Sequence, residues 1–344
     1  MPHPVLTAAI DRVASGEDLS VDETASVLST IMSGDAGEVQ IAAFLIALRT
    51  KAETEDELAG LARAMRQFAT PVTTARDDLL DVVGTGGGRR TFNVSTTAAV
   101  IAAGAGCAVA KHGNRSATSL SGAADVLEAL GARIDLSPAA VGRCIDEVGF
   151  GFLFAPTHHQ ATRYVIPVRR DLAVRTVFNL LGPLTNPAGA RRQLVGVADG
   201  SFLERMAGAV QRLGTDRALL VSSEDGLDEM STSGVTRVVE VGDSQERRSY
   251  RVSAADFGLA PARFEDVMGG TPADNAATAR AILAGEHGAP RDLAVLNAGA
   301  AIYAAGRADS IGAGVTAAQA SIDTGAAAGA LERYVEITHR LGDG

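Results

Sequence analysis

The sequence predicts an α/β protein with two parts: a small all-helical N-terminal domain and a large α/β domain in which helices flank a central sheet. Residues 1–70 contain only helical patterns of apolar residues. After Pro71, short apolar runs alternate with alanine-rich helical stretches, which is typical of a sheet with helices on its faces. The 344 residues, 46% hydrophobic and 21% charged, provide apolar material for one large core and one smaller core.

At least three helices are predicted in the N-terminal part. Ser20-Val-Asp-Glu23 and Thr54-Glu-Asp-Glu57 have the sequence of a capping box, in which a hydroxyl accepts from the third helical N–H and a glutamate reaches back. Between them, Val39–Leu48 is almost entirely apolar, which predicts a helix buried between its neighbours. Thr70-Pro71 ends the helical part.

The second part is predicted from the alternation of apolar runs and helical stretches. Strands are expected at Leu79–Val83, Cys107–Ala110, Gly151–Phe154 and Ala218–Val221, and helices at Ser95–Ala103, Ser121–Leu130 and Pro138–Val148. Residues 163–187 break this rhythm with helix-like stretches bounded by prolines, and we expect them to pack back on the N-terminal helices. The expected division is a helical domain of residues 1–70, joined by 163–187, and an α/β domain of residues 71–162 and 188–344.

Composition and charge exclude several classes of protein. The chain has 31 basic and 41 acidic side chains, a formal net charge of −10, whereas a general nucleic-acid surface would be cationic. No stretch resembles a membrane span and the N-terminus lacks a secretory pattern, so we expect a cytoplasmic protein with no membrane partner. Cys107 and Cys144 lie outside any metal-ligand spacing and are expected to be buried thiols.

A glycine-rich turn after the first predicted strand indicates a phosphate-binding site. In Asp81-Val-Val-Gly-Thr-Gly-Gly-Gly-Arg-Arg-Thr-Phe-Asn-Val-Ser-Thr96, an apolar run leads into glycines and then into a helix. Glycines permit close approach to an anion, and Asn93–Thr96 is expected to cap the helix, whose positive dipole end faces the same spot. The pattern is neither G-x-G-x-x-G nor G-x-x-x-x-G-K-[ST], and a glycine-rich turn alone is often purely structural.

Two further polar clusters follow predicted strands. Lys111-His-Gly-Asn-Arg-Ser-Ala-Thr-Ser119 lies where open α/β sheets bind ligands and holds more donors than a connection needs, although His112 could instead be a core-packed imidazole. Ser222-Ser-Glu-Asp-Gly-Leu-Asp-Glu-Met230 carries four carboxylates. Such loops are usually solvated, but this one follows a strand, and Mg²⁺ prefers one or two carboxylates together with phosphate oxygens and water.

A basic pair lies in an apolar neighbourhood, in Pro167-Val-Arg-Arg-Asp-Leu172. One arginine is expected to bind a substrate carboxylate through two parallel hydrogen bonds, and the other to form an ion pair with Asp171. A phosphorylated ligand of an acidic protein must meet a local positive field, which backbone dipoles, a few cations and a metal ion would supply.

Together these motifs resemble the anthranilate phosphoribosyltransferase family. The resemblance rests on the glycine turn and on Asn93–Thr96, Lys111–Ser116, Ser121–Gly131, Val168–Leu172, Arg175–Pro187 and Glu224–Glu229. It extends over essentially the whole chain, through Leu296–Ala300 and Ala320–Gly325. In two places the chain departs from the family pattern: Gly88-Arg89-Arg90-Thr91 is one residue shorter and brings two arginines, and Gln160 replaces a proline.

The resemblance implies a homodimer with a nucleoside-phosphorylase-like fold that transfers the phosphoribosyl group of phosphoribosyl pyrophosphate to the amine of anthranilate, the second step of tryptophan biosynthesis. It implies a Mg²⁺ cofactor, with contacts from Ser95, Asp228 and Glu229. It implies anthranilate contacts from Gly84, Asn114 and Arg169. For phosphoribosyl pyrophosphate it implies Gly84, Gly87, Gly88, Thr91, Asn93, Val94, Ser95, Thr96, Lys111, His112, Gly113, Asn114, Arg115, Ser116, Ala117, Thr118, Ser119 and Ala123.

No acid–base residue is expected, because the aromatic amine of anthranilate is neutral at pH 7 and can attack the ribose without losing a proton first. Lys111, Asn114 and Arg169 are expected to position the substrates, while pyrophosphate leaves an oxocarbenium-like sugar. Two alternatives stay open: a pyrimidine nucleoside phosphorylase and a non-catalytic relative that binds nucleic acid. The acidic pair Asp228 and Glu229 argues against the first, and the net charge against the second.

Overall fold

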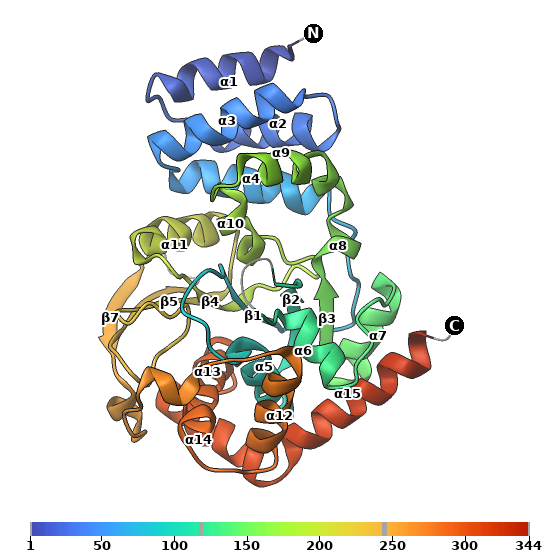
Figure 1. Ribbon diagram of the computed structural model, residues 1–344, viewed down its shortest axis with the longest axis vertical. Helices are drawn as coiled ribbons and strands as arrows, with labels where there is room; N and C mark the ends of the chain where they lie inside the picture. Colours follow the sequence, from blue (N-terminus) through green and yellow to red (C-terminus); the bar gives the residue numbers. More distant parts are fainter. Residues whose placement is uncertain (1, 117–119, 243–245, 343–344) are drawn as a thin grey trace.

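The computed structural model describes residues 2–116, 120–242 and 246–342, and it contains a helical part and an α/β part (Figure 1). The helices of the N-terminal part are α1 (Pro4–Ala14), α2 (Val21–Met32), α3 (Glu38–Lys51) and α4 (Glu55–Gln67). Both predicted capping boxes are confirmed. Ser20 Oγ accepts from Glu23 N at 3.3 Å at the start of α2. Thr54 Oγ1 accepts from Glu57 N at 3.2 Å at the start of α4.

The prediction that Val39–Leu48 is buried between its neighbours is wrong for one face of α3. Phe44 and Leu48 are buried, but Val39 is 83% exposed and Ile46 is 37% exposed. Positions 39, 43 and 46 recur at helical spacing, so they share the face opposite the buried one. We call Val39, Ala43 and Ile46 the α3 stripe; it presents apolar side chains at the surface.

A seven-stranded sheet forms the centre of the second part. Its strands are β1 (Leu79–Gly84), β2 (Ala108–Gly113), β3 (Phe150–Phe154), β4 (Arg192–Gly196), β5 (Arg217–Ser223), β6 (Thr236–Gly242) and β7 (Arg248–Val252). They lie in the order β3-β2-β1-β4-β5-β6-β7, with β1 to β5 parallel and β6 and β7 antiparallel. The strand order reverses between β1 and β4, and such a switch point is where open α/β sheets bind ligands.

The four strands that the sequence predicts are confirmed as β1, β2, β3 and β5, and the fold class is confirmed with them. The predicted helices correspond to α5 (Val94–Gly104), α6 (Ala123–Ala129) and α7 (Pro138–Val148). The other helices are α8 (Ala155–His158), α9 (Ile166–Leu172), α10 (Phe178–Leu181), α11 (Leu203–Arg212), α12 (Pro272–Leu283), α13 (Ala289–Ala304), α14 (Ile311–Asp323) and α15 (Ala326–Gly342). Short 3₁₀ helices cover Gln160–Tyr164, Gly182–Leu184, Gly200–Phe202, Ala254–Phe257 and Phe264–Val267. None of the helices described is long and apolar enough to cross a bilayer.

Two buried apolar clusters hold these elements together. The larger one packs α5, α13 and α15 against β1 to β3; Ile101, Leu296 and Tyr334 belong to it. The second cluster combines the N-terminal helices with α9, α10 and α11 and with one face of β4 to β6. Figure 1 shows α1–α4 at one end of the molecule with α9 beside them, and α12–α15 at the other end.

The second cluster is accompanied by an ion cluster between the same elements. Glu55, at the start of α4, accepts from Arg247 at 2.6 and 2.8 Å and forms an ion pair with Arg212 at the end of α11. Arg205 Nη1 donates to the carbonyl oxygen of Glu53 at 3.2 Å. Apolar and polar contacts therefore both join the N-terminal helices to α11.

Candidate active site

The glycine turn runs from the end of β1 at Gly84 to the start of α5 at Val94. Gly86 and Gly87 have φ values of +67° and +82°, in the left-handed region that favours glycine. A Cβ atom on Gly84 would lie 2.6 Å from Asp228 Oδ2, and one on Gly87 would clash with the guanidinium of Arg175. Both the backbone conformation and close neighbours therefore require glycine here.

The acidic loop between β5 and β6 contacts this glycine turn directly. Gly86 N donates to Asp228 Oδ2 at 3.0 Å, and Arg89 N donates to the carbonyl oxygen of Gly226 at 3.0 Å. The two loops follow β1 and β5, which lie on either side of β4. The sheet topology therefore joins two of the predicted motifs into one site, at the switch point.

Asp228 and Glu229 are each partly exposed as whole residues, but their carboxyl groups are surrounded by protein. Burial raises the pKa of Asp228, against a hydrogen bond from Gly86 N that favours the charged form. Burial, with the negative charges of Asp228 and Asp225, raises the pKa of Glu229 well above its usual range. Glu229 Oε2 is buried without a partner among the described residues. A cation placed here would stabilise both charges.

The donors present fit Mg²⁺ held jointly with a phosphorylated ligand. Across the described ranges, no group of three His, Cys, Asp or Glu side chains could enclose a metal ion. The site instead offers two adjacent carboxylates, one of which has an unpartnered oxygen. Mg²⁺ usually keeps several waters and takes one or two protein carboxylates together with phosphate oxygens. Ser95 and this pair share a neighbour, Lys111. The ammonium of Lys111 donates to Ser95 Oγ, and the negative charge of Glu229 acts to raise the pKa of Lys111.

Lys111 is a buried cation beneath the glycine turn. Its Nζ donates to the carbonyl oxygen of Val82 at 2.6 Å and to Ser95 Oγ at 3.3 Å. Burial lowers the pKa of Lys111 to about 8, although the charges of Asp81 and Glu229 oppose this shift. Burial raises the pKa of Asp81 to about 6. The ammonium of Lys111 is therefore the buried positive charge that faces the acidic loop.

His112 belongs to a group of three buried imidazoles. Its Nδ1 lies 3.1 Å from the carbonyl oxygen of Gly182, and its ring centroid lies 5.1 Å from that of His159. Burial, and then the neighbouring His159, lower the pKa of His112 to about 3. Nε2 of His112, His158 and His159 is buried without a partner among the described residues. The ring of His112 is therefore neutral, and the three imidazoles keep buried Nε2 atoms without partners among the described residues.

The expected capping of α5 by Asn93 differs in the structure. Asn93 occupies the N-cap position, but its side chain makes no hydrogen bond to the helix. Its Oδ1 accepts from Ser121 Oγ at 2.8 Å and from Asn275 Nδ2 at 2.9 Å. These long-range partners, which sequence spacing does not reveal, draw the side chain away. Thr96 N and Thr97 N donate to the carbonyl oxygen of Asn93 at 3.1 and 3.0 Å, and Val94 N donates to that of Phe92. Ser95 N has no acceptor among the described residues, so it can donate to an anion at the start of the helix.

The segment after β2 is engaged on α6. Asn114 is exposed, and its Oδ1 accepts from Arg115 N at 2.7 Å. Arg115 forms ion pairs with Asp125 at 2.8 Å and Glu128 at 2.6 Å, and these carboxylates raise its pKa. Its guanidinium is therefore bound to α6. Three of the expected ligand residues lie outside the described residues: Ala117, Thr118 and Ser119.

The other expected residues surround this centre in different ways. Thr91 pairs with Met268 in an isolated antiparallel bridge, and its hydrogen bond to Glu229 favours the charged carboxylate. Thr96 Oγ1 is buried without a partner among the described residues. Gly113 ends β2, where a Cβ would lie 3.0 Å from Cβ of Ala123. Three expected residues remain. Gly88 lies in the glycine turn, Val94 is the first residue of α5, and Ser116 lies three residues after the end of β2.

The predicted ion pair of one arginine of the basic pair with Asp171 is confirmed. Arg170 forms an exposed ion pair with Asp171 at 3.3 Å. Arg169 is partly buried, and its guanidinium carbon lies 5.4 Å from the ring centroid of Phe178. It has no ion pair within the described residues. Burial lowers the pKa of Arg169. Arg169 is therefore the member of the pair that is free to bind an anionic ligand.

Sequence reasoning missed two side chains that shape the site. Arg175 Nη2 donates to the carbonyl oxygen of Gly86 at 2.9 Å. Asn186 Nδ2 donates to Asp81 Oδ2 and to the carbonyl oxygen of Ala110, both at 2.8 Å. Both residues lie within residues 163–187, for which the sequence predicts packing on the N-terminal helices and, beyond Arg169, no ligand contact. The available signal was a cation and an amide in an otherwise apolar, proline-bounded stretch.

Comparisons with known proteins agree with this architecture. Residues 7–69 match a glycosyl transferase family helical bundle domain, and residues 76–328 match a glycosyl transferase family α/β domain. Anthranilate phosphoribosyltransferase from Rubrobacter xylanophilus is 53% identical, with 98% of each chain covered. The enzyme of the same name from Moorella thermoacetica is 51% identical, covering 96% of this chain and 98% of the relative.

Solved structures give the same result. The crystal structure of anthranilate phosphoribosyltransferase from Thermus thermophilus has a TM-score of 0.91 and 46% identity, covering 96% of this chain and 99% of that one. The Saccharomyces cerevisiae enzyme in complex with phosphoribosyl pyrophosphate and Mg has a TM-score of 0.88 and 27% identity, with 98% of each chain covered.

The helical bundle, the α/β sheet and the glycine-lined site at its switch point define a glycosyl transferase. Its relatives agree on one reaction. The chain belongs to the anthranilate phosphoribosyltransferase family, whose members transfer a phosphoribosyl group to anthranilate.

Proposed function

We propose that this chain joins phosphoribosyl pyrophosphate to anthranilate, giving N-(5-phosphoribosyl)anthranilate and pyrophosphate, where the glycine turn meets the acidic loop. The contact between Gly86 N and Asp228 Oδ2 carries this proposal. It puts backbone donors for phosphate and carboxylates for a cation in one place, at the switch point of the sheet. Such a combination suits a substrate that carries a diphosphate and a metal ion.

The diphosphorylated sugar is proposed to bind along three backbone segments. Gly84, Gly87 and Gly88 allow close approach of the main chain, and the start of α5 supplies the N–H group of Ser95 and a positive dipole end. Lys111 supplies the buried positive charge. The other residues proposed to contact this substrate are Thr91, Asn93, Val94, Ser95, Thr96, His112, Gly113, Asn114, Arg115, Ser116 and Ala123. This role for Arg115 requires its guanidinium to leave Asp125 and Glu128.

Mg²⁺ is the cofactor, proposed to be held by Asp228, Glu229 and Ser95 together with oxygens of the diphosphate. The unpartnered Glu229 Oε2 and the raised pKa values of both acids support this assignment. When bound, the ion neutralises charge that grows on the departing pyrophosphate.

Anthranilate is proposed to bind with its carboxylate on Arg169. This guanidinium is partly buried and lacks an acidic partner in the part of the chain described, so a planar carboxylate can take two parallel hydrogen bonds from it. Gly84 and Asn114 are proposed to complete the contacts of the aromatic acid.

The proposed chemistry asks the protein mainly for position and charge. The aromatic amine attacks the anomeric carbon as pyrophosphate leaves, so the nucleophile needs no strong base. The N–H groups of Gly87 and Gly88, which have no acceptor among the described residues, and the ammonium of Lys111 stabilise the leaving diphosphate. The neutral ring of His112 adds no charge to the positive sugar of the transition state.

Loss of anthranilate fluorescence tests this function. We expect emission to fall steadily when the protein meets anthranilate, phosphoribosyl pyrophosphate and Mg²⁺, and to stay constant when any of the three is omitted or chelated. The protein has no tryptophan, so its own emission interferes little. Release of thymine from thymidine and phosphate, without consumption of anthranilate, would instead identify a nucleoside phosphorylase.

A homodimer is proposed on the basis of the α3 stripe. Val39 is 83% exposed, and Ile166 on the adjoining α9 is 55% exposed, so apolar side chains gather on this end of the molecule. Large exposed apolar patches commonly mark protein–protein contacts. A second copy of the chain is the partner that the family resemblance implies.

We further propose a cytoplasmic enzyme without a nucleic-acid partner, divided as the sequence suggests. Cys107 and Cys144 are free buried thiols, which accords with a reducing compartment, and the net charge of −10 opposes binding to a polyanion. The helical domain comprises residues 1–70 together with 163–187. Inclusion of Val165, Val168 and Phe178 in the same buried cluster as α1–α4 supports this division.

A further inference from the structure

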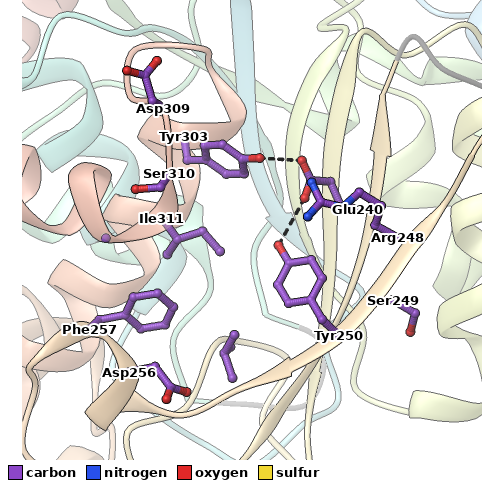
Figure 2. A pocket seen from close by; sticks show the side chains of 12 residues that line it. Glu240, Arg248, Ser249, Tyr250, Asp256, Phe257, Tyr303, Asp309, Ser310 and Ile311 are labelled. Atoms are coloured by element: carbon purple, nitrogen blue, oxygen red, sulfur yellow. Dashed lines mark hydrogen bonds between the residues drawn. The ribbon is translucent and has the colours of Figure 1, made fainter.

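A pocket of about 780 Å³ lies at the antiparallel edge of the sheet, apart from the active site (Figure 2). Its walls come from β6 and β7, from the 3₁₀ turn Ala254–Phe257, from the end of α13 and from the start of α14. None of its lining residues belongs to the catalytic site proposed above. Its volume is in the range of small-molecule sites.

The central polar group of the pocket is Glu240, which is held from two sides. Tyr303 Oη on α13 donates to Glu240 Oε1 at 2.6 Å, and Tyr250 Oη on β7 donates to Oε2 at 3.3 Å. Burial raises the pKa of both tyrosines, so the phenols stay protonated and keep donating. Each carboxylate oxygen keeps a free lone pair for a further donor. Glu240 is therefore a fixed acceptor for a ligand, without an ion pair among the described residues.

The rest of the lining is apolar at the wall and acidic at the rim. Phe257 and the rings of the two tyrosines surround the cavity, and aromatic faces carry negative potential. Asp256, which also accepts from Ser253, and Asp309 add two more carboxylates. In the described part of the chain one basic residue lines the pocket, Arg248, which lies opposite Glu240 in the register of β6 and β7. The lining therefore favours a positive ligand.

The geometry narrows the class of cation. A bare metal ion needs several converging protein oxygens, and no group of three acidic or imidazole side chains within residues 2–116, 120–242 and 246–342 is placed to supply them. The aromatic wall instead suits a cation with an apolar body, because aromatic rings attract a positive charge and also pack against apolar groups. We propose that this pocket binds a small organic cation, a primary ammonium ion on an apolar body, with the ammonium on Glu240 and the body against Phe257 and the tyrosine rings.

Intrinsic fluorescence offers a readout close to this site. The chain has four tyrosines and no tryptophan, and Tyr250 and Tyr303 both line the pocket. Cyclohexylmethylammonium is a suitable probe because it does not absorb in the near ultraviolet. Cyclohexylmethanol and cyclohexanecarboxylate are matched neutral and anionic compounds. Titrations are made in the presence of phosphoribosyl pyrophosphate and Mg²⁺, so that the catalytic site is occupied.

We expect a saturable change in tyrosine emission with the ammonium compound, binding of the alcohol weaker by about tenfold or more, and no saturation with the carboxylate. The factor reflects a hydrogen bond between charged groups compared with a neutral one. Equal affinity for the ammonium compound and the alcohol, or no saturation with the ammonium compound, would overturn the proposal.

Variants identify the residues involved. Glu240→Gln removes the charge and keeps one oxygen that accepts from a tyrosine, while its amide nitrogen can donate to the hydroxyl oxygen of the other tyrosine. It should weaken cation binding by about tenfold or more. Glu286→Gln changes an exposed carboxylate outside the pocket and should leave binding unchanged. Transferase activity checks that each variant folds. If Glu240→Gln fails that check, Asp309→Asn at the rim takes its place, with a smaller loss expected. Unaltered affinity in the folded pocket variant would contradict the assignment.

Discussion

Arg175 Nη2 donates a 2.9 Å hydrogen bond to the carbonyl oxygen of Gly86, in the centre of the glycine turn. The carbonyl oxygen of Arg175 in turn accepts from Arg49 Nη1 at 2.9 Å, at the C-terminal end of α3. One residue thus connects the N-terminal helices to the loop that is proposed to bind the diphosphate. Substrate binding and the placement of the helical part should therefore be coupled.

Substitution of Arg175 should weaken binding of phosphoribosyl pyrophosphate. Arg175→Ala removes a charged hydrogen bond that holds the glycine turn, a loss of about 1.5–3 kcal/mol or roughly tenfold or more in KM, with a smaller change in kcat. Arg175→Lys should recover part of the loss. Steady-state kinetics in both substrates measure the effect. Arg170→Ala, which changes an exposed arginine paired with Asp171, is the control. Equal kinetics for the two alanine variants would show that the side chain of Arg175 does not support the glycine turn.

The acidic pair should be required for turnover. The double change Asp228→Ala, Glu229→Ala is expected to lower kcat/KM by about 100-fold or more, the scale of losing a preorganised electrostatic contact. A Mg²⁺ titration should also show that saturation moves to higher concentration. Glu224→Ala, in the same loop but paired with Arg251 at the surface, is the matched control. Near-normal turnover of the double variant at limiting Mg²⁺ would exclude these acids as metal ligands.

Arg169 should act on anthranilate and not on the sugar substrate. Arg169→Ala removes the proposed two-point contact with the carboxylate, so KM for anthranilate should rise by about tenfold to 100-fold. KM for phosphoribosyl pyrophosphate should change little, and Arg169→Lys should restore only part of the affinity because an ammonium lacks the planar fork. A variant that raises both KM values equally would argue for a structural role.

Acid should destabilise the protein through its buried histidines. Burial lowers the pKa of His112 to about 3 and, with His158, lowers that of His159 to about 4, from 6.5 in the unfolded chain. The unfolded state therefore binds more protons below about pH 6.5. The stability from these neutral rings is complete above that pH and decreases as pH falls, by at most about 1.4 kcal/mol per unit for each histidine. Asp81 opposes this trend, because burial raises its pKa to about 6.

Urea unfolding between about pH 7 and pH 5 measures this dependence. His159→Asn should make the decrease in the free energy of unfolding less steep, because it removes one of the three buried rings whose pKa burial lowers. His339→Asn changes an exposed histidine and should leave the slope as it is. Parallel curves for all three proteins would show that buried His159 does not contribute.

The α3 stripe should control the oligomeric state. Val39→Glu combined with Ile46→Glu places two charges on the apolar face and should convert a dimer into a monomer, as sedimentation or light scattering would report. Ser26→Glu, at an exposed position of α2, is the control. A double variant that stays dimeric would place the interface elsewhere.

The features predictable from the sequence are the local ones. The capping boxes of α2 and α4 are set within four residues, and the glycine turn and acidic loop are recognisable because each follows an apolar run. Residues brought in from far along the chain escaped prediction: the donor to Gly86 comes from Arg175, and Asn93 is drawn to Ser121 and Asn275.

The sequence also did not reveal which faces of some elements are exposed. Strands β6 and β7 mix charged with apolar residues, because one face of this antiparallel edge is open, and they lack the continuous apolar runs of the inner strands. The α3 stripe was predicted to be buried because an apolar side chain looks the same in the sequence whether it packs in the core of the chain or lies at the surface.

The buried cluster shared by α1–α4, α9 and α11 cannot be completed until residues far along the chain have been synthesised. The first 70 residues leave the ribosome early, yet Val168 and Met206, which complete their core, are made more than 90 residues later. At about 5–20 residues per second, this delay is on the order of ten seconds. During that time part of the apolar surface of α1–α4 lacks the side chains that cover it in the folded protein, so this segment is prone to aggregation until α9 and α11 have been made.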